Sequence, residues 1–137
     1  MSARPTGSIG LVATLAAALT AVICASVVLV AQSRREFDVV ASKYMFRVSG
    51  SGSSEIRVSQ NDLVRVNFST EDIPHSFTIE DHDESHYRIM RRAEPGRPVS
   101  FDFRADTPGR FRFYCSLTID DRCKEMQGTL IVEPRTP

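Results

Sequence analysis

Several features that would point to common functions are missing from this sequence of 137 residues. Neither sign of charge is in excess, because 17 Lys and Arg residues balance 17 Asp and Glu residues, so no long-range field attracts a nucleic acid or an acidic substrate. The sequence also lacks a nucleophile with its base, a carboxylate pair placed for acid–base work and a glycine-rich phosphate loop. These absences argue against nucleic-acid binding and disfavour a hydrolase or a phosphotransferase.

Charged residues are also missing from one long segment near the N-terminus. The apolar run Ile9–Ala31 contains no charged residue and, at about 1.5 Å per residue, is long enough to cross a bilayer core of about 30 Å. The composition changes near Ser33, where charged residues become frequent. We therefore expect one N-terminal transmembrane helix, in residues 1–33, and one folded domain, in residues 34–137.

A cleaved secretory signal is the alternative for this segment. Such a signal has a shorter apolar centre and a small-residue cleavage motif, whereas the run continues through Val27–Val30 without one. The uncleaved anchor is favoured, and Cys24 within it is interpreted as a membrane-buried thiol without chemistry. Arg4 on one side, with Arg34 and Arg35 on the other, leaves the orientation undecided.

The rest of the chain has the pattern of short strands. Apolar and polar residues alternate in short runs that glycine, proline and asparagine turns separate, and no helical periodicity extends over ten or more residues. The predicted strands are Phe37–Ala41, Tyr44–Val48, Glu55–Ser59, Leu63–Ser69, Ser76–Glu80, Tyr87–Met90, Val99–Arg104, Gly109–Tyr114 and Gly128–Val132. The side chains interpreted as core are Met45, Phe46, Phe68, Phe77, Phe101, Phe103, Phe111 and Phe113. This pattern predicts an all-β Greek-key sandwich of about seven or eight strands.

Sulfur and imidazole side chains gather at the ends of predicted strands. Cys115, Cys123 and Met126 lie in one predicted loop, at spacings of eight and three residues, and His75 stands at the start of another strand. A loop that leaves one strand and enters the next can fold back so that these side chains converge on one ion. Soft sulfur ligands with one imidazole favour copper, above all Cu(I), or zinc over magnesium or calcium.

A family resemblance strengthens this prediction of a metal site. The segments that carry it are, in order, Asp72–Phe77, Glu94–Arg97, Ala105–Phe111, Phe113–Cys115 and Met126–Val132. They resemble the cupredoxin family, particularly the periplasmic domain of cytochrome c oxidase subunit II and the related domain of nitrous oxide reductase. The resemblance implies a cupredoxin β-sandwich on the periplasmic or extracellular side of the cell membrane. It also implies a histidine copper ligand at His75, a thiolate at Cys115 and a weak axial thioether at Met126.

The sequence departs from that family at two positions. Dinuclear members place a second bridging cysteine where this chain has Ile119, so we expect one copper ion rather than a dinuclear centre. Mononuclear and dinuclear members alike place a second histidine where this chain has Cys123. Two thiolates with one imidazole favour Cu(I) more strongly than one thiolate with two imidazoles. The hypotheses are a respiratory electron-transfer site, with a c-type cytochrome or oxidase subunits as partners, or a site that holds and delivers Cu(I).

Other interpretations of the two thiols stay open. Outside the cytoplasm, Cys115 and Cys123 could form a disulfide and leave a metal-free accessory or structural subunit of a membrane respiratory complex. Zinc or another ion could also occupy the site. A thiol–disulfide oxidoreductase is disfavoured, because the spacing is wide and no helix N-terminus is evident that would lower a thiol pKa.

The remaining polar residues are interpreted as parts of the protein surface rather than as ligands of the metal site. A strand that begins at His75 would carry His82 and His86 roughly 17 Å away, at about 3.3 Å per residue, so they are interpreted as a solvated turn. Glu125, beside Met126, is interpreted as exposed. The basic residues of the middle of the domain, interpreted as outer strand faces rather than as a docking site for an acidic partner, are Arg88, Arg91, Arg92, Arg97, Arg104, Arg110 and Arg112.

Overall fold

The computed structural model describes Ala3, residues 33–80 and residues 87–136. Within these ranges, no helix is both long enough and apolar enough to span a bilayer. The predicted transmembrane helix, Cys24, His82 and His86 all lie outside the described residues. The division between an anchor and a domain therefore stays a prediction.

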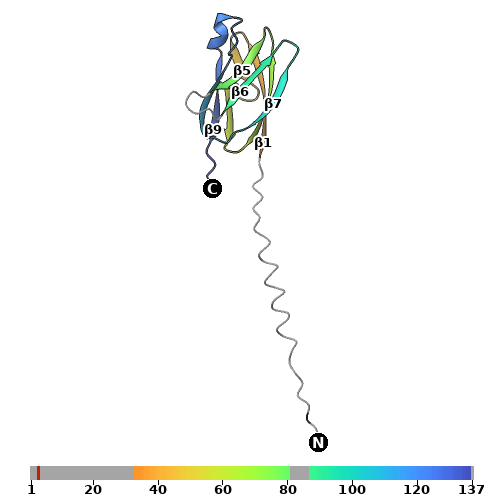
Figure 1. Cartoon of the computed structure of the whole chain (residues 1–137), viewed down its shortest axis with the longest axis vertical. Helices are drawn as coiled ribbons and strands as arrows, with labels where there is room; N and C mark the ends of the chain where they lie inside the picture. The colour runs from red at the N-terminus through yellow and green to blue at the C-terminus, as the bar shows by residue number, and fades with distance from the viewer. Residues whose placement is uncertain (1–2, 4–32, 81–86, 137) are drawn as a thin grey trace. The chain divides into compact units, whose positions relative to one another are not determined.

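Nine strands in the described residues form two sheets (Figure 1). The four-stranded sheet has the order β2 (Met45–Val48), β1 (Arg34–Ser42), β4 (Leu63–Thr70) and β7 (Val99–Arg104). The five-stranded sheet has the order β3 (Glu55–Ser59), β9 (Gln127–Glu133), β8 (Gly109–Tyr114), β5 (His75–Glu80) and β6 (Arg88–Ala93). The pairs β1–β4 and β3–β9 are parallel, and the other pairs are antiparallel. The prediction of an all-β sandwich is confirmed.

The core lies between the sheets because alternate residues of each strand face inward. In β4 every second residue is buried, among them Val66 and Phe68. Phe77 stacks on Phe113 with ring centroids 4.7 Å apart, and Phe46 meets Phe113 edge-on at 5.2 Å. The prediction that Met45 lies in the core is wrong: Met45 is 52% exposed, because Phe46 takes the inward position of β2.

A glycine allows the closest packing in this core. Gly128 of β9 pairs with Phe113 of β8. A Cβ atom at position 128 would lie 2.5 Å from the carbonyl oxygen of Ser54 and still closer to the Phe113 ring, so only glycine fits. Phe113 precedes Cys115 by two residues, and this packing therefore fixes the strand end from which the predicted ligand loop departs.

The two ends of the domain have different polar chemistry. At one end, near the start of β1, the buried carboxylate of Asp62 accepts hydrogen bonds from the Ser33 hydroxyl, the Ser59 N–H at 3.0 Å and Arg135 at 2.8 Å. Burial alone raises the pKa of Asp62, but the Ser33, Ser59 and Arg135 contacts outweigh it and hold the pKa below its ordinary value. The 3₁₀ helix η2 (Asp121–Glu125) lies at the other end, opposite the C-terminus in Figure 1.

Candidate metal centre

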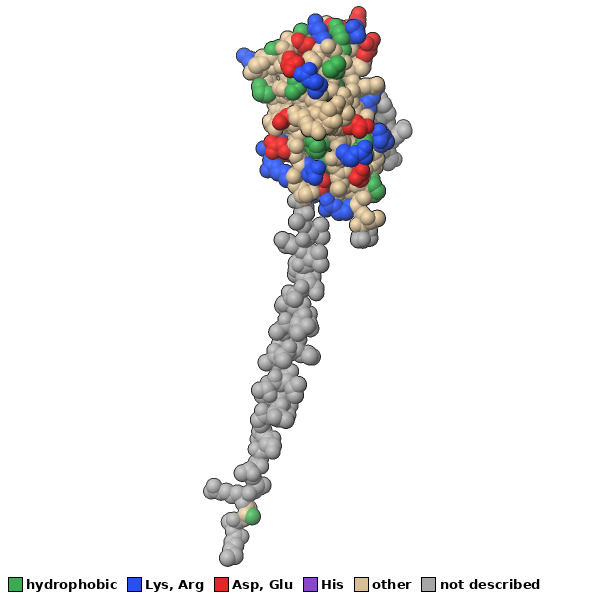
Figure 2. Space-filling model, turned by 180° about the vertical axis from the view of Figure 1, so that it is seen from behind, with side chains coloured by type: hydrophobic (Ala, Val, Ile, Leu, Met, Phe, Trp, Pro, Cys, Tyr) green, Lys and Arg blue, Asp and Glu red, His purple; other side chains and the backbone are tan. Residues whose placement is uncertain are grey.

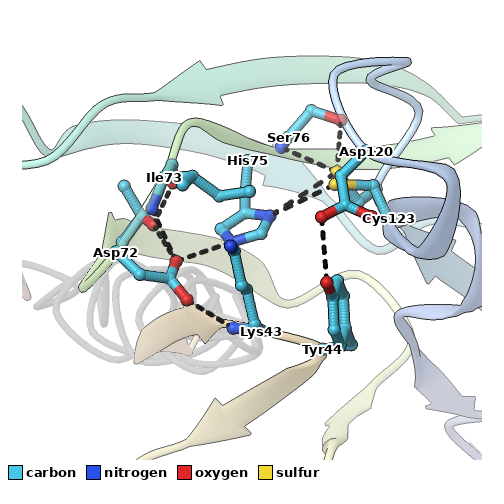
Figure 3. A network of polar contacts seen from close by, with 10 residues as sticks. Lys43, Tyr44, Asp72, Ile73, His75, Ser76, Asp120 and Cys123 are labelled. Carbon is cyan, nitrogen blue, oxygen red and sulfur yellow. Dashed lines mark hydrogen bonds and ion pairs between the residues drawn. The ribbon is translucent and has the colours of Figure 1, made fainter.

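Three of the four predicted ligands meet at the end of the sandwich that carries η2. His75 Nδ1 lies 3.8 Å from Cys115 Sγ and 3.9 Å from Cys123 Sγ. One ligand atom from each residue lies within 4.8 Å of the other two. All three side chains are fully buried. Figure 3 shows the His75 ring directed at the sulfur atoms.

Two strand ends and the helix η2 position the three side chains of this triangle. His75 is the first residue of β5, which is paired on both sides, with β6 and with β8. Cys115 directly follows β8, and its N–H donates to the Met126 carbonyl at 3.3 Å, which closes the base of the loop. Cys123 reaches the cluster from η2, of which it is the buried residue.

The helix η2 was absent from the sequence prediction, which found no helical periodicity over ten or more residues in the domain. Asp120 caps the helix by accepting a hydrogen bond from the Arg122 N–H at 3.0 Å, and Asp121 lies in the first turn. The paired acidic residues were the signal available in the sequence. A helix of five residues is too short for a hydrophobic period to reveal it.

Of the neighbouring residues in this loop, Met126 is buried, whereas Ile119 and Glu125 are exposed. Met126 is fully buried and donates its N–H to the Cys123 carbonyl at 3.1 Å, so it lies in the loop closure beside the cluster. Ile119 is 53% exposed, so its side chain lies outside the cluster. Glu125 is exposed, as predicted, and pairs with Arg122 at 3.3 Å.

A carboxylate that sequence reasoning missed holds the His75 ring. Asp72 Oδ1 accepts a hydrogen bond from His75 Nε2 at 2.9 Å. Since a carboxylate only accepts, the ring proton belongs on Nε2 and the lone pair of Nδ1 faces the two sulfurs. The position of Asp72, three residues before the histidine, was the available signal.

Backbone groups keep Asp72 ionised. The Ile73 N–H donates to it at 2.7 Å and the Lys43 N–H at 2.6 Å. Partial burial by itself raises the pKa of Asp72, but these two N–H groups and the His75 ring outweigh it and lower the pKa. The group that orients the imidazole is therefore a fixed negative charge at neutral pH.

The two cysteines are free thiols in a dry environment. Burial, together with the charge and hydrogen bond of Cys115, raises the pKa of Cys123 to about 11. The backbone N–H of Ser76 points at Cys115 Sγ from 3.5 Å. A thiol with a raised pKa is a poor nucleophile at neutral pH, which argues further against a thiol–disulfide oxidoreductase.

A tyrosine that sequence reasoning also missed braces the loop. The Tyr44 hydroxyl donates to Asp120 Oδ2 at 2.9 Å, and the Arg122 guanidinium carbon lies 4.1 Å from the centroid of the Tyr44 ring. The hydrogen bond to Asp120 raises the pKa of Tyr44. The Arg122 N–H, and then the Tyr44 hydroxyl, hold the pKa of Asp120 below its ordinary value. Because 76 residues separate Tyr44 from Asp120, no local pattern announces the contact.

The donor set fits a soft metal ion. Two sulfur atoms and an imidazole nitrogen with its lone pair turned toward them match the ligand preferences of Cu(I) and of Zn²⁺. Oxygen donors, which Mg²⁺ and Ca²⁺ require, do not belong to this triangle.

Comparison with known proteins agrees with this architecture. No protein-family model matches the chain. A nitrous-oxide reductase of Stutzerimonas stutzeri is 33% identical over 87 residues, which are 61% of this chain and 13% of the reductase. The periplasmic domain of cytochrome oxidase subunit II of Bradyrhizobium japonicum superposes with a TM-score of 0.61 at 16% identity, covering 73% of this chain and 84% of that domain.

A small blue copper protein has the same architecture over its whole length. Auracyanin A of Chloroflexus aurantiacus superposes with a TM-score of 0.58 at 15% identity, covering 74% of this chain and all of auracyanin. The described domain has the cupredoxin fold. The expected resemblance to cupredoxins and to subunit II is thus confirmed for the fold, and the resemblance to the reductase is confirmed in sequence over the 87 matched residues. The cupredoxin domain spans a small fraction of the reductase, so the activity of that enzyme is not transferred to this chain.

Proposed function

We propose that this cupredoxin domain binds one copper ion through His75, Cys115, Cys123 and Met126, and that it transfers electrons in a respiratory system. The buried triangle of one imidazole nitrogen and two sulfurs, placed at the loop end of a cupredoxin sandwich, is the observation that carries the proposal. Copper bound there would supply a one-electron couple between Cu(I) and Cu(II).

The residues of the chain suit this role because they are fixed before any ion binds. Asp72 sets the tautomer and orientation of His75. The Ser76 N–H supports negative charge on Cys115 Sγ. Complete burial excludes water from the cluster, so the donors need little rearrangement between two charge states. A rigid, dry donor set favours electron transfer.

Cu(I) holding and delivery is the second candidate. The presence of a second sulfur in place of an imidazole favours it, because two thiolates stabilise Cu(I) relative to Cu(II). Zinc fits the same donors and is an outcome that the titration below distinguishes.

The proposal includes a location and partners. Residues 1–33 would anchor the domain to the cell membrane, with the domain on the periplasmic or extracellular side. A c-type cytochrome or the subunits of a respiratory oxidase would exchange electrons with it. The apolar run Ile9–Ala31 supports the anchor, and the likeness to a periplasmic subunit II domain supports the compartment and the partners.

An anaerobic Cu(I) titration of the reduced full-length chain tests the proposal. We expect uptake of one equivalent, abolished in Cys115→Ser and retained in the matched control Cys24→Ser, which also removes one thiol. After oxidation, an intense thiolate-to-copper absorption band supports electron transfer, and its absence supports Cu(I) delivery. No uptake by the reduced chain, or tighter binding of Zn²⁺ than of Cu(I), refutes the copper proposal; the former favours a metal-free accessory subunit.

A further inference from the structure

The candidate metal cluster is closed to solvent, so an ion reaches or leaves it only when a segment of the chain moves. His75 and Cys115 cannot move freely, because His75 belongs to β5 and Cys115 follows β8, and both strands are paired on each side. Cys123 lies instead in η2, a 3₁₀ helix of five residues whose other residues are all exposed. Short 3₁₀ turns have poor hydrogen-bond geometry and little burial to hold them. Moving the η2 segment therefore costs less free energy than moving the strands β5 and β8 that hold the other two side chains.

The contacts that fasten η2 to the sandwich converge on the turn between β1 and β2. Tyr44 of that turn donates its hydroxyl proton to Asp120, the capping residue of η2, at 2.9 Å. The Arg122 side chain of η2 covers the face of the Tyr44 ring, with the guanidinium carbon 4.1 Å from the ring centroid. In Figure 3 the Tyr44 hydroxyl points at Asp120 directly beside Cys123.

The same turn also holds the opposite side of the cluster. The Lys43 N–H donates to Asp72 at 2.6 Å, and Asp72 in turn fixes the His75 ring. The Lys43 contact uses a backbone N–H, and the Asp72 carboxylate that it reaches is also held by the Ile73 N–H and by His75 of β5. The Tyr44 contact uses a side chain against a short helix. The Tyr44 side is thus the half of this clamp that can release.

We propose that Tyr44 is a latch: its hydrogen bond to Asp120 keeps η2 closed over Cys123 and sets the rate at which the enclosure opens for a metal ion to enter or leave. The role in metal exchange rests on the proposed copper function. The opening itself belongs to the chain and occurs with or without an ion.

The reactivity of single thiols in the metal-free, full-length chain tests the opening. The chain is treated with iodoacetamide, and the peptides that contain Cys115 and Cys123 are quantified separately by mass spectrometry. In Tyr44→Phe we expect alkylation of Cys123 to be about three- to tenfold faster, the change in an opening equilibrium that loss of one partly exposed hydrogen bond of ordinary strength produces. Cys115, beside the paired strand β8, should accelerate less.

Tyr114→Phe is the matched control. Tyr114 is half-buried like Tyr44 and directly precedes Cys115, but its hydroxyl lies 3.5 Å from Glu80, away from η2. This variant should react as the wild type does. A Cys123 rate in Tyr44→Phe that equals the wild-type rate overturns the latch. A rise that both cysteines share equally, and that matches a loss of global stability in urea, also overturns it.

A double variant tests whether the two groups act through one bond. If they do, Tyr44→Phe combined with Asp120→Asn reacts no faster at Cys123 than the faster single variant. Fully multiplicative effects contradict the latch, because they mean that Tyr44 and Asp120 act independently.

Release of Cu(I) to a chelator distinguishes the Tyr44 latch from the proposed copper-binding function. With an excess of a Cu(I) chelator, Tyr44→Phe should release Cu(I) faster by the same factor, while its equilibrium affinity stays unchanged because the closed form still predominates. A chain that shows the Cys123 effect but takes up no Cu(I) removes the copper function and leaves the latch. Equal release from Tyr44→Phe and the wild type, with normal uptake, keeps the function and removes the latch from metal exchange.

Discussion

The hydrogen bond between Asp72 and His75 makes the substitution Asp72→Asn a sharp test of how the cluster is organised. Asp72 Oδ1 accepts from the His75 ring and from the Ile73 N–H, and Oδ2 accepts from the Lys43 N–H. An asparagine has the same shape but one acceptor oxygen and one donor group. In either orientation of the amide, its NH₂ group faces an N–H group that is itself a donor.

The two orientations of the amide have different costs. If the oxygen faces His75, the amide NH₂ opposes the Lys43 N–H, and the turn that braces the site is pushed away. If the NH₂ faces His75, Nε2 must become the acceptor, and the ring proton moves to Nδ1, the atom that faces the sulfurs. Loss of such an outer partner typically lowers metal affinity by about 10- to 100-fold. We expect Asp72→Asn to weaken Cu(I) binding by this factor.

Chelator competition measures the Cu(I) affinity, and nitrogen chemical shifts of His75 report the tautomer in the metal-free chain. Asp121→Asn is the charge-matched control, because Asp121 is exposed on η2 and should leave both readouts unchanged. The reasoning is refuted if Asp72→Asn and Asp121→Asn bind Cu(I) equally and His75 keeps its proton on Nε2 in both.

Three further predictions concern the cluster, the core and the opposite end of the domain. Cys123→His should shift the binding preference from Cu(I) toward Cu(II), since it gives a donor set with two imidazoles and one thiolate. Anaerobic Cu(I) and aerobic Cu(II) titrations compare the two affinities, and an unchanged preference would contradict the role given to the second sulfur. Gly128→Ala should lower the free energy of unfolding by about 1–3 kcal/mol, measured in urea, because the added methyl group overlaps the Phe113 ring; a neutral effect would show that the core yields there. Asp62→Asn should cost about 1–3 kcal/mol near neutral pH, because it removes the charge that Arg135 and its neighbours stabilise. Since the pKa of Asp62 is lower in the folded chain than in the unfolded chain, this stabilisation is present above the unfolded pKa and is lost as the pH falls through the folded pKa. The stability gap between wild type and Asp62→Asn should therefore narrow as the pH falls below the ordinary pKa of an aspartate, about 3.9, and a constant gap would refute the assignment.

The strands were predictable because alternation is a local property. The predicted strand Glu55–Ser59 and the predicted strand Val99–Arg104 coincide with β3 and β7. The predicted start of β1 at Phe37 was late, because Arg34, Arg35 and Glu36 carry no apolar signal although they pair with β4. The parallel pairings of β1 with β4 and of β3 with β9 join distant segments, which no local pattern reveals.

The candidate site was predictable to the extent that its chemistry lies in the identity of single residues. The sequence places His75 and Cys115 at strand ends and Cys123 in the loop that follows Cys115. This placement predicted that the three would converge, and the structure brings them together. The residues that organise them were missed, because Tyr44 and Asp120 meet only in the folded chain. The wrong placement of Met45 in the core came from hydrophobicity alone, since the alternation within β2 turns it outward.

The position of β9 determines when, during folding, the cluster of His75, Cys115 and Cys123 is completed. Among the strands of the described residues, β9 comes last in sequence, yet it lies between β3 and β8 within its sheet. It begins directly after Met126, whose carbonyl closes the loop onto Cys115. The parallel pairing of β3 with β9 joins distant segments and is therefore slow to form. A chain in which β9 has not yet paired therefore holds the two thiols without this loop closure, and the triangle of His75, Cys115 and Cys123 is complete only in the finished domain.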